Sequence, residues 1–281
     1  PFAWFAALAG IANAQNIIDG KAAPDTLGVT AVDARTLRVQ LDKPLPWFSN
    51  LTASFAFYPV QKANVESGDS WTRPGSLIGN GAYVLKDRVV NEKLVVVPNT
   101  HYWDNGKTVI QQVTFTPINQ ESAATKRYLA GDIDITESFP KNMYQKLMKD
   151  IPGQVYTPPQ LGTYYYAFNT QKGPTADERV RLALSMTIDR RLMAEKILGT
   201  GEKPAWRFTP DVTAGFTPQP SQIESMSQAE LNAQAKALLQ AAGYGPGRPL
   251  KLSLLYNTSE NHQKIAIAVA SMWKKNLGVD V

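Results

Sequence analysis

Few side chains in this sequence could carry out acid–base or metal chemistry. The two histidines, His101 and His262, are far apart, and neither has the spacing of a zinc-binding HExxH helix. Asp132 and Asp134 are two residues apart in a predicted strand, so both carboxylates would lie on one face. They could form an acid pair or a metal site, or they could line a solvent-exposed strand edge. No third ligand is near them in the sequence, which favours the exposed edge.

Patterns for nucleophilic catalysis and phosphate binding are also lacking. The sequence has no GxSxG motif. It has no cysteine, which excludes disulfides, cysteine-ligated zinc and thiol catalysis. The glycine-rich turn at Gly79 to Gly81 lacks the Lys-Ser/Thr pair of a phosphate-binding loop. We therefore expect no enzyme activity, no metal and no cofactor, and we keep a hydrolase of peptides or glycans as the alternative.

The composition is that of an ordinary globular protein. The 281 residues are 43% hydrophobic and 19% charged, with a formal net charge of +5. Lysine and arginine are scattered and not interleaved with aromatics in one block, so we expect no nucleic-acid partner. No run of eighteen apolar residues predicts a membrane span. The chain starts at Pro1 without a methionine or signal peptide and stops at Val281 as a strand begins, so we expect a fragment of a longer protein.

The stretch from Gly162 to Gly201 is the most informative part of the sequence. The aromatic run 163–169 is typical of a strand. Thr175 and Glu178 have the spacing of a capping box, and a helical pattern of apolar residues follows. Asp189 is placed to cap a second helix, which glycines at 199 and 201 would end. We therefore expect a strand, a turn and two helices here.

The same patterns predict the elements on either side of this stretch. Helical spacing predicts helices near the start of the chain and at 62–67, 121–130, 139–149, 228–242 and 260–277. The helix at 228–242 is preceded by a capping box at Ser227 and Glu230. Alternating apolar residues predict a hairpin over 28–41 and strands at 82–85, 93–97, 109–117, 131–136 and 250–256. A strand, a helix and a second strand at Val279 would form a parallel βαβ unit.

Five blocks in this order resemble the peptide- and nickel-type solute-binding proteins of ABC importers. The resemblance covers essentially the whole chain, and its specificity comes from the order of the blocks. They are residues 79–85 (GNGAYVL), 99–104 (NTHYWD), 128–135 (YLAGDIDI), 177–190 (DERVRLALSMTIDR) and 237–244 (ALLQAAGY).

This resemblance implies an α/β fold of the type II periplasmic-binding-protein kind. Such a fold has two lobes and an extra inserted domain, and this chain would cover only part of it. Residues 1–60 would be the end of the inserted domain, 61–161 the middle segment of the first lobe, and 162–281 the first half of the second lobe. Gly162 would then lie near a hinge crossing.

The resemblance also implies a function and a binding site. Segments 160–166 and 255–262 are similar to the branch that binds murein peptide. The chain would belong to a monomeric periplasmic receptor that binds murein tripeptide, L-Ala-γ-D-Glu-meso-diaminopimelate, or short oligopeptides, and delivers them to a membrane permease. A general oligopeptide receptor is the alternative. The implied peptide-binding residues are Phe2, Glu137, Ser138, Gly162, Tyr165, Asn257 and His262.

Two of these positions have a plainer interpretation. Phe2, with Trp4, could be an ordinary core aromatic, and His262 could be a surface histidine. Glu137 departs from the aromatic or amide found in the general peptide binders. We expect its carboxylate to meet the extra amine of diaminopimelate.

Overall fold

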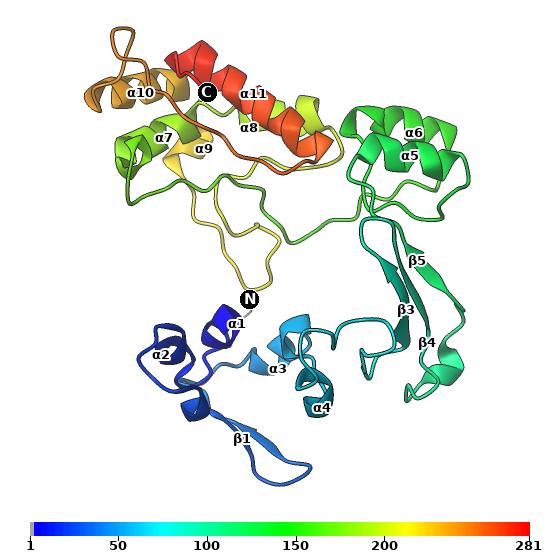
Figure 1. Ribbon diagram of the computed structural model, residues 1–281. Coiled ribbons are helices and arrows are strands. Elements are labelled where there is room, and N and C mark those ends of the chain that lie inside the picture. The colour runs from blue at the N-terminus through cyan, green and yellow to red at the C-terminus, as the bar shows by residue number, and fades with distance from the viewer. Residues whose placement is uncertain (1–2) are drawn as a thin grey trace. The chain divides into compact units, whose positions relative to one another are not determined.

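The computed structural model of the protein describes residues 3–281. They form two compact units, one ending at Pro117 and the other beginning at Ile118, and we describe each by itself. The first unit contains α1 (Ala3–Leu8), α2 (Ala14–Ile18), β1 (Val29–Ala31), β2 (Leu37–Val39), α3 (Phe48–Leu51), α4 (Lys62–Val65), β3 (Tyr83–Val89), β4 (Lys93–Pro98) and β5 (Val113–Phe115) (Figure 1). Short 3-10 helices lie at Pro24–Thr26, Phe55–Phe57 and Asn105–Lys107.

The second unit is mostly helical. It contains α5 (Glu121–Leu129), α6 (Tyr144–Asp150), α7 (Glu178–Met186), α8 (Arg190–Leu192), α9 (Gln222–Ser225), α10 (Gln228–Ala241) and α11 (Glu260–Leu277). A π-helix, Met193–Leu198, continues directly from α8, and 3-10 helices lie at Lys141–Met143 and Pro174–Ala176.

Two antiparallel sheets organise the first unit. The β1–β2 hairpin pairs Val29 with Val39, and its inner face packs on a small core around Ile11. Strands β3, β4 and β5 form a meander in that order. Asn91, with φ of 61°, supplies the left-handed residue that the β3–β4 turn needs. The predicted hairpin and the strands near 83, 93 and 113 are confirmed.

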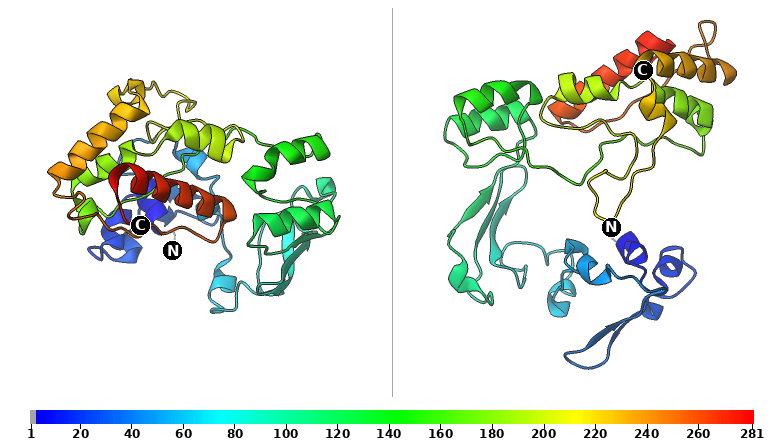
Figure 2. Two further views of the ribbon diagram at one scale, coloured as in Figure 1. Left: turned by 90° about the horizontal axis from the view of Figure 1, so that it is seen from above. Right: turned by 180° about the vertical axis from the view of Figure 1, so that it is seen from behind.

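The core of the second unit lies between α7, α10 and α11. Helix α10 packs against α7 and α11 (Figures 1 and 2). Fully buried members from the three helices are Leu184, Ala235 and Val269. Burying a side chain of valine or leucine size stabilises a fold by about 1.5–3 kcal/mol. Burial of these side chains therefore fixes the three helices to one another.

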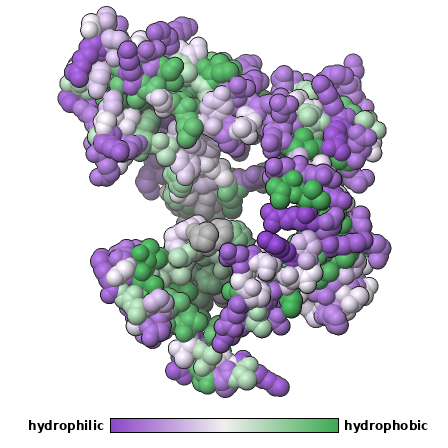
Figure 3. Space-filling model, viewed as in Figure 1, coloured by the Kyte–Doolittle hydropathy of each residue, from purple (hydrophilic) through white to green (hydrophobic). Residues whose placement is uncertain are grey.

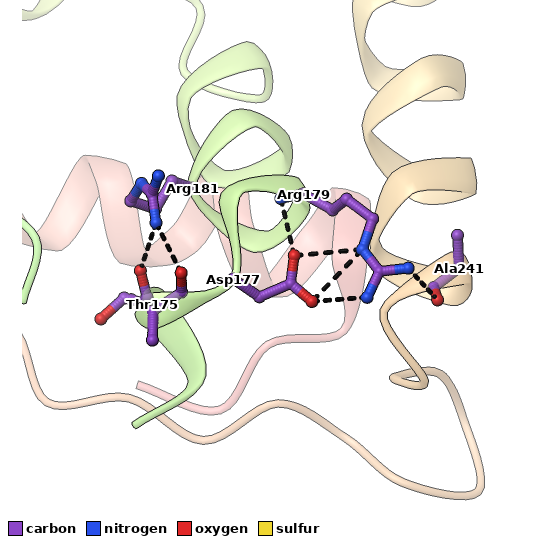
Figure 4. Close-up of polar contacts among 6 residues, drawn as sticks. Thr175, Asp177, Arg179, Arg181 and Ala241 are labelled. Carbon is purple, nitrogen blue, oxygen red and sulfur yellow. Dashed lines mark hydrogen bonds and ion pairs between the residues drawn. The ribbon is translucent and has the colours of Figure 1, made fainter. Parts of the chain in front are cut away.

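Local hydrogen bonds fix the start of α7, and they correct one prediction. The N-cap is Asp177, whose carboxylate accepts from the backbone amide of Arg179 at 2.9 Å (Figure 4). Thr175 is not the cap, because its hydroxyl donates to the carbonyl of Asn169. The Arg179 guanidinium also donates to the carbonyl of Ala241 at 2.8 Å, which ties the start of α7 to the end of α10.

Four other predicted helix boundaries are confirmed, while the helix predicted at 139–149 begins as an α-helix only at Tyr144. The side chain of Asp189 caps α8, Ser227 and Glu230 form a complete capping box on α10, and Gly199 and Gly278 end their helices at φ of 69° and 70°. Each of these signals depends only on residues within a few positions of the helix end, so it can be predicted from the sequence alone.

Three predicted strands are not formed. Residues 131–136, 163–169 and 250–256 have no ladder of strand hydrogen bonds, apart from one parallel bridge between Lys251 and Asp280. Around this bridge the amide of Leu252 donates to the carbonyl of Asp280 at 2.9 Å. A strand requires a neighbour, and the described residues supply none for the first two segments. The bridge does have the parallel sense predicted for the βαβ unit.

The surface in view mixes hydrophilic and hydrophobic side chains (Figure 3). Within residues 3–281, no helix has both the length and the apolar character needed to cross a membrane. The assignment of 1–60, 61–161 and 162–281 to an inserted domain and two lobes stays a prediction.

Candidate functional site

The first turn of α11 carries one predicted ligand-binding residue and contacts another. The Ser259 hydroxyl accepts a hydrogen bond from the backbone amide of His262 at 3.3 Å, as a helix N-cap does. His262 Nδ1 is hydrogen-bonded to the side-chain oxygen of Asn257. The imidazole centroid lies 5.2 Å from that of Tyr164. The structure therefore brings Asn257 and His262 together.

This contact determines what His262 can offer to a ligand. An amide oxygen only accepts hydrogen bonds, so the Asn257 contact is satisfied by the tautomer that carries its proton on Nδ1 of the imidazole. Nε2 then accepts in the neutral ring and donates once a second proton is bound. A carboxylate placed beside this ring would also be favoured by the helix N-terminus, which attracts negative charge.

The extended segment 161–169 presents exposed aromatic side chains. Tyr165 is 60% exposed, and its ring centroid lies 5.1 Å from that of Phe208. The Thr163 hydroxyl donates to the carbonyl of Phe208 at 2.7 Å, which fixes the segment to that loop. Gly162 is exposed, and a Cβ atom there would meet no atom within 4 Å. No steric reason within the described chain therefore requires glycine at this position.

Glu137 and Ser138 lie in the loop between α5 and α6, and both are exposed. The end of this loop is fixed to α11 by the buried side chain of Asn261. Its amide nitrogen donates to the carbonyl of Phe139 and its oxygen accepts from the amide of Lys141, both at 3.0 Å. Asn261 adjoins His262, so it links the loop of Glu137 to the turn that carries the histidine.

A second connection joins the first turns of α5 and α11. The Glu121 carboxylate accepts from the Ser259 hydroxyl and, at 2.9 Å, from the backbone amide of Glu260. In return, the Glu260 carboxylate accepts from the backbone amide of Ser122 at 2.7 Å and from its hydroxyl at 2.8 Å. We call these four residues the α5–α11 clasp. Sequence analysis missed both the clasp and Asn261, because only folding brings together partners that are 120 to 139 residues apart.

Two carboxylates near this region have shifted pKa values. Burial disfavours ionisation of Glu121, but hydrogen bonds from Ser259 and nearby backbone amides outweigh it and hold the pKa of Glu121 below its ordinary value. Burial likewise opposes ionisation of Glu202. The Lys141 ammonium, whose Nζ lies 2.8 Å from the Glu202 carboxylate, and the Thr200 hydroxyl together lower the pKa of Glu202. Both carboxylates are therefore ionised at neutral pH.

The remaining candidates have simpler surroundings. Phe2 lies outside the described residues. The side chain of Asp132 is 3.9 Å from Arg127, and Asp134 is exposed, so both aspartates lie on a solvated loop. Among residues 3–281, no group of three or more histidine, cysteine, aspartate or glutamate side chains is arranged to hold a metal ion.

Residues 3–281 match the family of bacterial extracellular solute-binding proteins, family 5 Middle. The chain therefore belongs to this family of solute-binding proteins. Over 281 residues it is 88% identical to the periplasmic murein peptide-binding protein MppA of Escherichia coli (strain K12), covering 100% of this chain and 52% of that protein.

Solved structures of MppA give the same relationship. The structure of the Escherichia coli murein tripeptide binding protein MppA matches with a TM-score of 0.97, at 88% identity, over 100% of this chain and 55% of that one. The unliganded open form of MppA matches over the same shares and at the same identity with a TM-score of 0.63.

These relatives confirm the predicted fold class. The chain has a mixed helix and sheet fold of the periplasmic binding proteins, and it spans about half the length of the relatives it matches. The relatives are named as binding proteins and not as enzymes, and MppA is named as periplasmic.

Proposed function

We propose that this chain is part of a periplasmic receptor that binds murein tripeptide, L-Ala-γ-D-Glu-meso-diaminopimelate, and delivers it to an ABC permease in the inner membrane. The observation that carries the proposal is the 88% sequence identity to the murein peptide-binding relative, in a match that covers the whole chain. The receptor is proposed to act as a monomer and to return its ligand unchanged.

The site chemistry supports a peptide ligand. Exposed Tyr164 and Tyr165 offer apolar ring faces with a polar hydroxyl, which suits a ligand with both peptide groups and side chains. His262, held by Asn257 at the start of α11, is proposed to meet a peptide carboxylate. Backbone hydrogen bonds and bridging waters would supply the remaining affinity.

The other proposed contacts lie around these residues. Gly162 has open space where a side chain would lie, which would admit a ligand backbone, and Ser138 offers a hydroxyl from the α5–α6 loop. Phe2 is proposed as an aromatic wall of the cleft. Segments of the longer protein outside this chain would complete the site.

The test of this function is a calorimetric titration with the murein tripeptide and, in parallel, with trilysine. It should be run on this chain and on a protein of the relatives' full length. Binding of the murein tripeptide alone supports the specific receptor. Binding of both peptides supports a general oligopeptide receptor, which is the alternative. Binding of neither to the full-length protein would refute a peptide receptor.

Glu137 is proposed to select for diaminopimelate. Its exposed carboxylate would pair with the ligand's extra amine, and a hydrogen bond between charged groups is stronger than a neutral one. Glu137→Gln should weaken the murein tripeptide about tenfold, and it should leave a tripeptide without that amine nearly unchanged. Asp134→Asn is the control, since it removes another exposed carboxylate of the same loop. Equal weakening of both peptides by Glu137→Gln would refute the role.

A hydrolase of peptides or glycans is distinguished by the fate of the ligand. After incubation with the protein, chromatography should recover all of the murein tripeptide intact. Cleavage that depends on protein concentration would refute the receptor as the whole function.

A further inference from the structure

The second unit contains two segments that are joined by polar contacts. Its hydrophobic core and the side chains packed against that core all come from residues 166–279. None comes from the segment 118–150, which carries α5 and α6. Interfaces that are polar and lack a shared core resemble those between domains that move relative to each other. The junction between these segments therefore has the character of a surface that can separate.

The clasp is the part of this junction with the most specific geometry. The positive ends of α5 and α11 face each other there, which is unfavourable for two helix dipoles. Each helix begins with a glutamate that accepts hydrogen bonds from the first turn of the other helix or from its cap. The carboxylates of Glu121 and Glu260 thus offset the unfavourable interaction between the two helix dipoles. Their hydrogen bonds exist only while the two segments are in contact.

Two further contacts extend the junction from the clasp. Asn261 binds the backbone at Phe139 and Lys141. The ammonium of Lys141 lies within 2.9 Å of the hydroxyl of Thr200 and 2.8 Å of the carboxylate of Glu202. Every partner on one side belongs to 121–141, and every partner on the other side belongs to 200–261. Hydrogen bonds therefore connect the two segments at three places along the junction.

We propose that the α5–α11 clasp is a closing contact of the receptor, which sets ligand affinity without touching the ligand. The proposal rests on the proposed function and on the prediction that 61–161 and 162–281 belong to different lobes. The clasp residues are positioning residues. They hold the loop of Glu137 and the turn of His262 in register when the lobes close.

The affinity argument follows from linked equilibria. If the ligand binds the closed form, its apparent dissociation constant is the intrinsic constant divided by the closed fraction. Losing the clasp lowers that fraction, so affinity falls although every ligand contact remains. The two solved MppA structures differ in how well this chain superposes on them, so the relative is known in more than one arrangement.

The test compares Glu121→Gln with Glu178→Gln. Glu121 and Glu178 are each the first residue of a helix, but the carboxylate of Glu178 makes none of these contacts between segments. We expect Glu121→Gln to weaken binding of the murein tripeptide about tenfold and Glu178→Gln to leave it unchanged. Only the first substitution removes a charged acceptor of hydrogen bonds between the two segments. Ser122→Ala, which removes one neutral donor to Glu260, is a milder second variant.

A distance measurement separates closure from a merely structural role. The chain has no cysteine, so spin labels can be placed uniquely at Lys126→Cys on α5 and Ser271→Cys on α11, both exposed. In the wild type we expect the murein tripeptide to narrow the distribution of distances between the two labels and to shift it to shorter distances. In Glu121→Gln we expect a broader and longer distribution, at ligand concentrations that close the wild type.

Three outcomes would overturn the clasp. The first is an affinity of Glu121→Gln equal to that of Glu178→Gln. The second is a distance distribution that does not change with ligand. The third is loss of thermal stability without a change in either quantity, since that is what a purely structural contact gives. If the wild type binds no peptide, the proposed function fails. The clasp is then judged by whether Glu121→Gln broadens the ligand-free distribution.

Discussion

Replacing Asn261 with alanine is a sharp test of how the α5–α6 loop is held. The side chain is 8% exposed and makes two hydrogen bonds of 3.0 Å, to the carbonyl of Phe139 and the amide of Lys141. A typical neutral hydrogen bond contributes about 1 kcal/mol net, so the pair contributes about 2 kcal/mol. That is close to a 30-fold change in the equilibrium between the docked and undocked loop.

Hydrogen exchange at the amide of Lys141 reports this equilibrium directly. Its only hydrogen bond among those of the described chain is to Asn261, so local opening controls its exchange. We expect Asn261→Ala to accelerate exchange at Lys141 by about 30-fold, with core amides such as that of Leu184 unchanged. Asn142→Ala, an exposed neighbour, is the control and should have no effect.

Two results would refute this reasoning. Unchanged exchange at Lys141 in Asn261→Ala would mean that the loop is held by other contacts. Equal acceleration at Lys141 and in the core would mean that the substitution destabilises the whole unit and does not act locally. Asn261→Asp gives a further check. It keeps the acceptor for Lys141 but turns a carboxylate towards the carbonyl of Phe139, so it should also accelerate exchange.

Two other perturbations have outcomes that follow from single contacts. Because Lys141 holds the pKa of Glu202 below its ordinary 4.5, Glu202 stabilises the fold above that pH and loses this effect as the pH falls through the lowered value. Thermal melts of wild type and Glu202→Gln should therefore differ at pH 7 and converge in acid; a constant difference would contradict this. Trp273 is buried and donates to the carbonyl of Leu184 at 2.8 Å, so Trp273→Phe should cost about 1–3 kcal/mol in urea unfolding. Trp103→Phe, at an 84% exposed position, should cost almost nothing, and equal losses would refute the role of that hydrogen bond.

The features that the sequence predicted correctly depend on neighbours along the chain. Ser227 caps α10 because its own hydroxyl reaches the amide of Glu230, three residues later. Gly278 ends α11 because glycine adopts a left-handed conformation at little cost. The same logic failed at Thr175, where two acceptable caps compete within three residues and Asp177 takes the position.

The features that the sequence could not predict depend on distant partners. The run 163–169 has the composition of a strand, but a strand forms only beside another strand. The segment is extended instead, with Tyr166 and Phe168 packed on the core and Tyr164 and Tyr165 exposed. The composition of the run thus indicated an extended segment that packs on the core, while hydrogen-bond pairing could not be predicted from it.

The candidate site divides in the same way. The contact between Asn257 and His262 spans five residues, and both were predicted as ligand-binding positions. The reciprocal glutamates of the clasp are ordinary first-turn residues in the sequence, where acidic side chains are common. Nothing local indicates that each of them faces the other helix. The ligand-binding roles of all seven predicted residues stay predictions that the binding experiments test; they are Phe2, Glu137, Ser138, Gly162, Tyr165, Asn257 and His262.

Helix α11 couples the position of His262 in the candidate site to the packing of the core. At 1.5 Å per residue its 18 residues span about 27 Å. His262 stands near one end, and the face that the helix buries in the core runs from Ile265 to Trp273. A tilt of about 5° about Trp273, which lies about 16 Å along the helix from His262, would move the start of the helix by about 1.4 Å, which exceeds the roughly 0.5 Å tolerance of a preorganised site. We therefore expect substitutions in the core, remote from any peptide, to displace His262 and to weaken its proposed contact with the ligand.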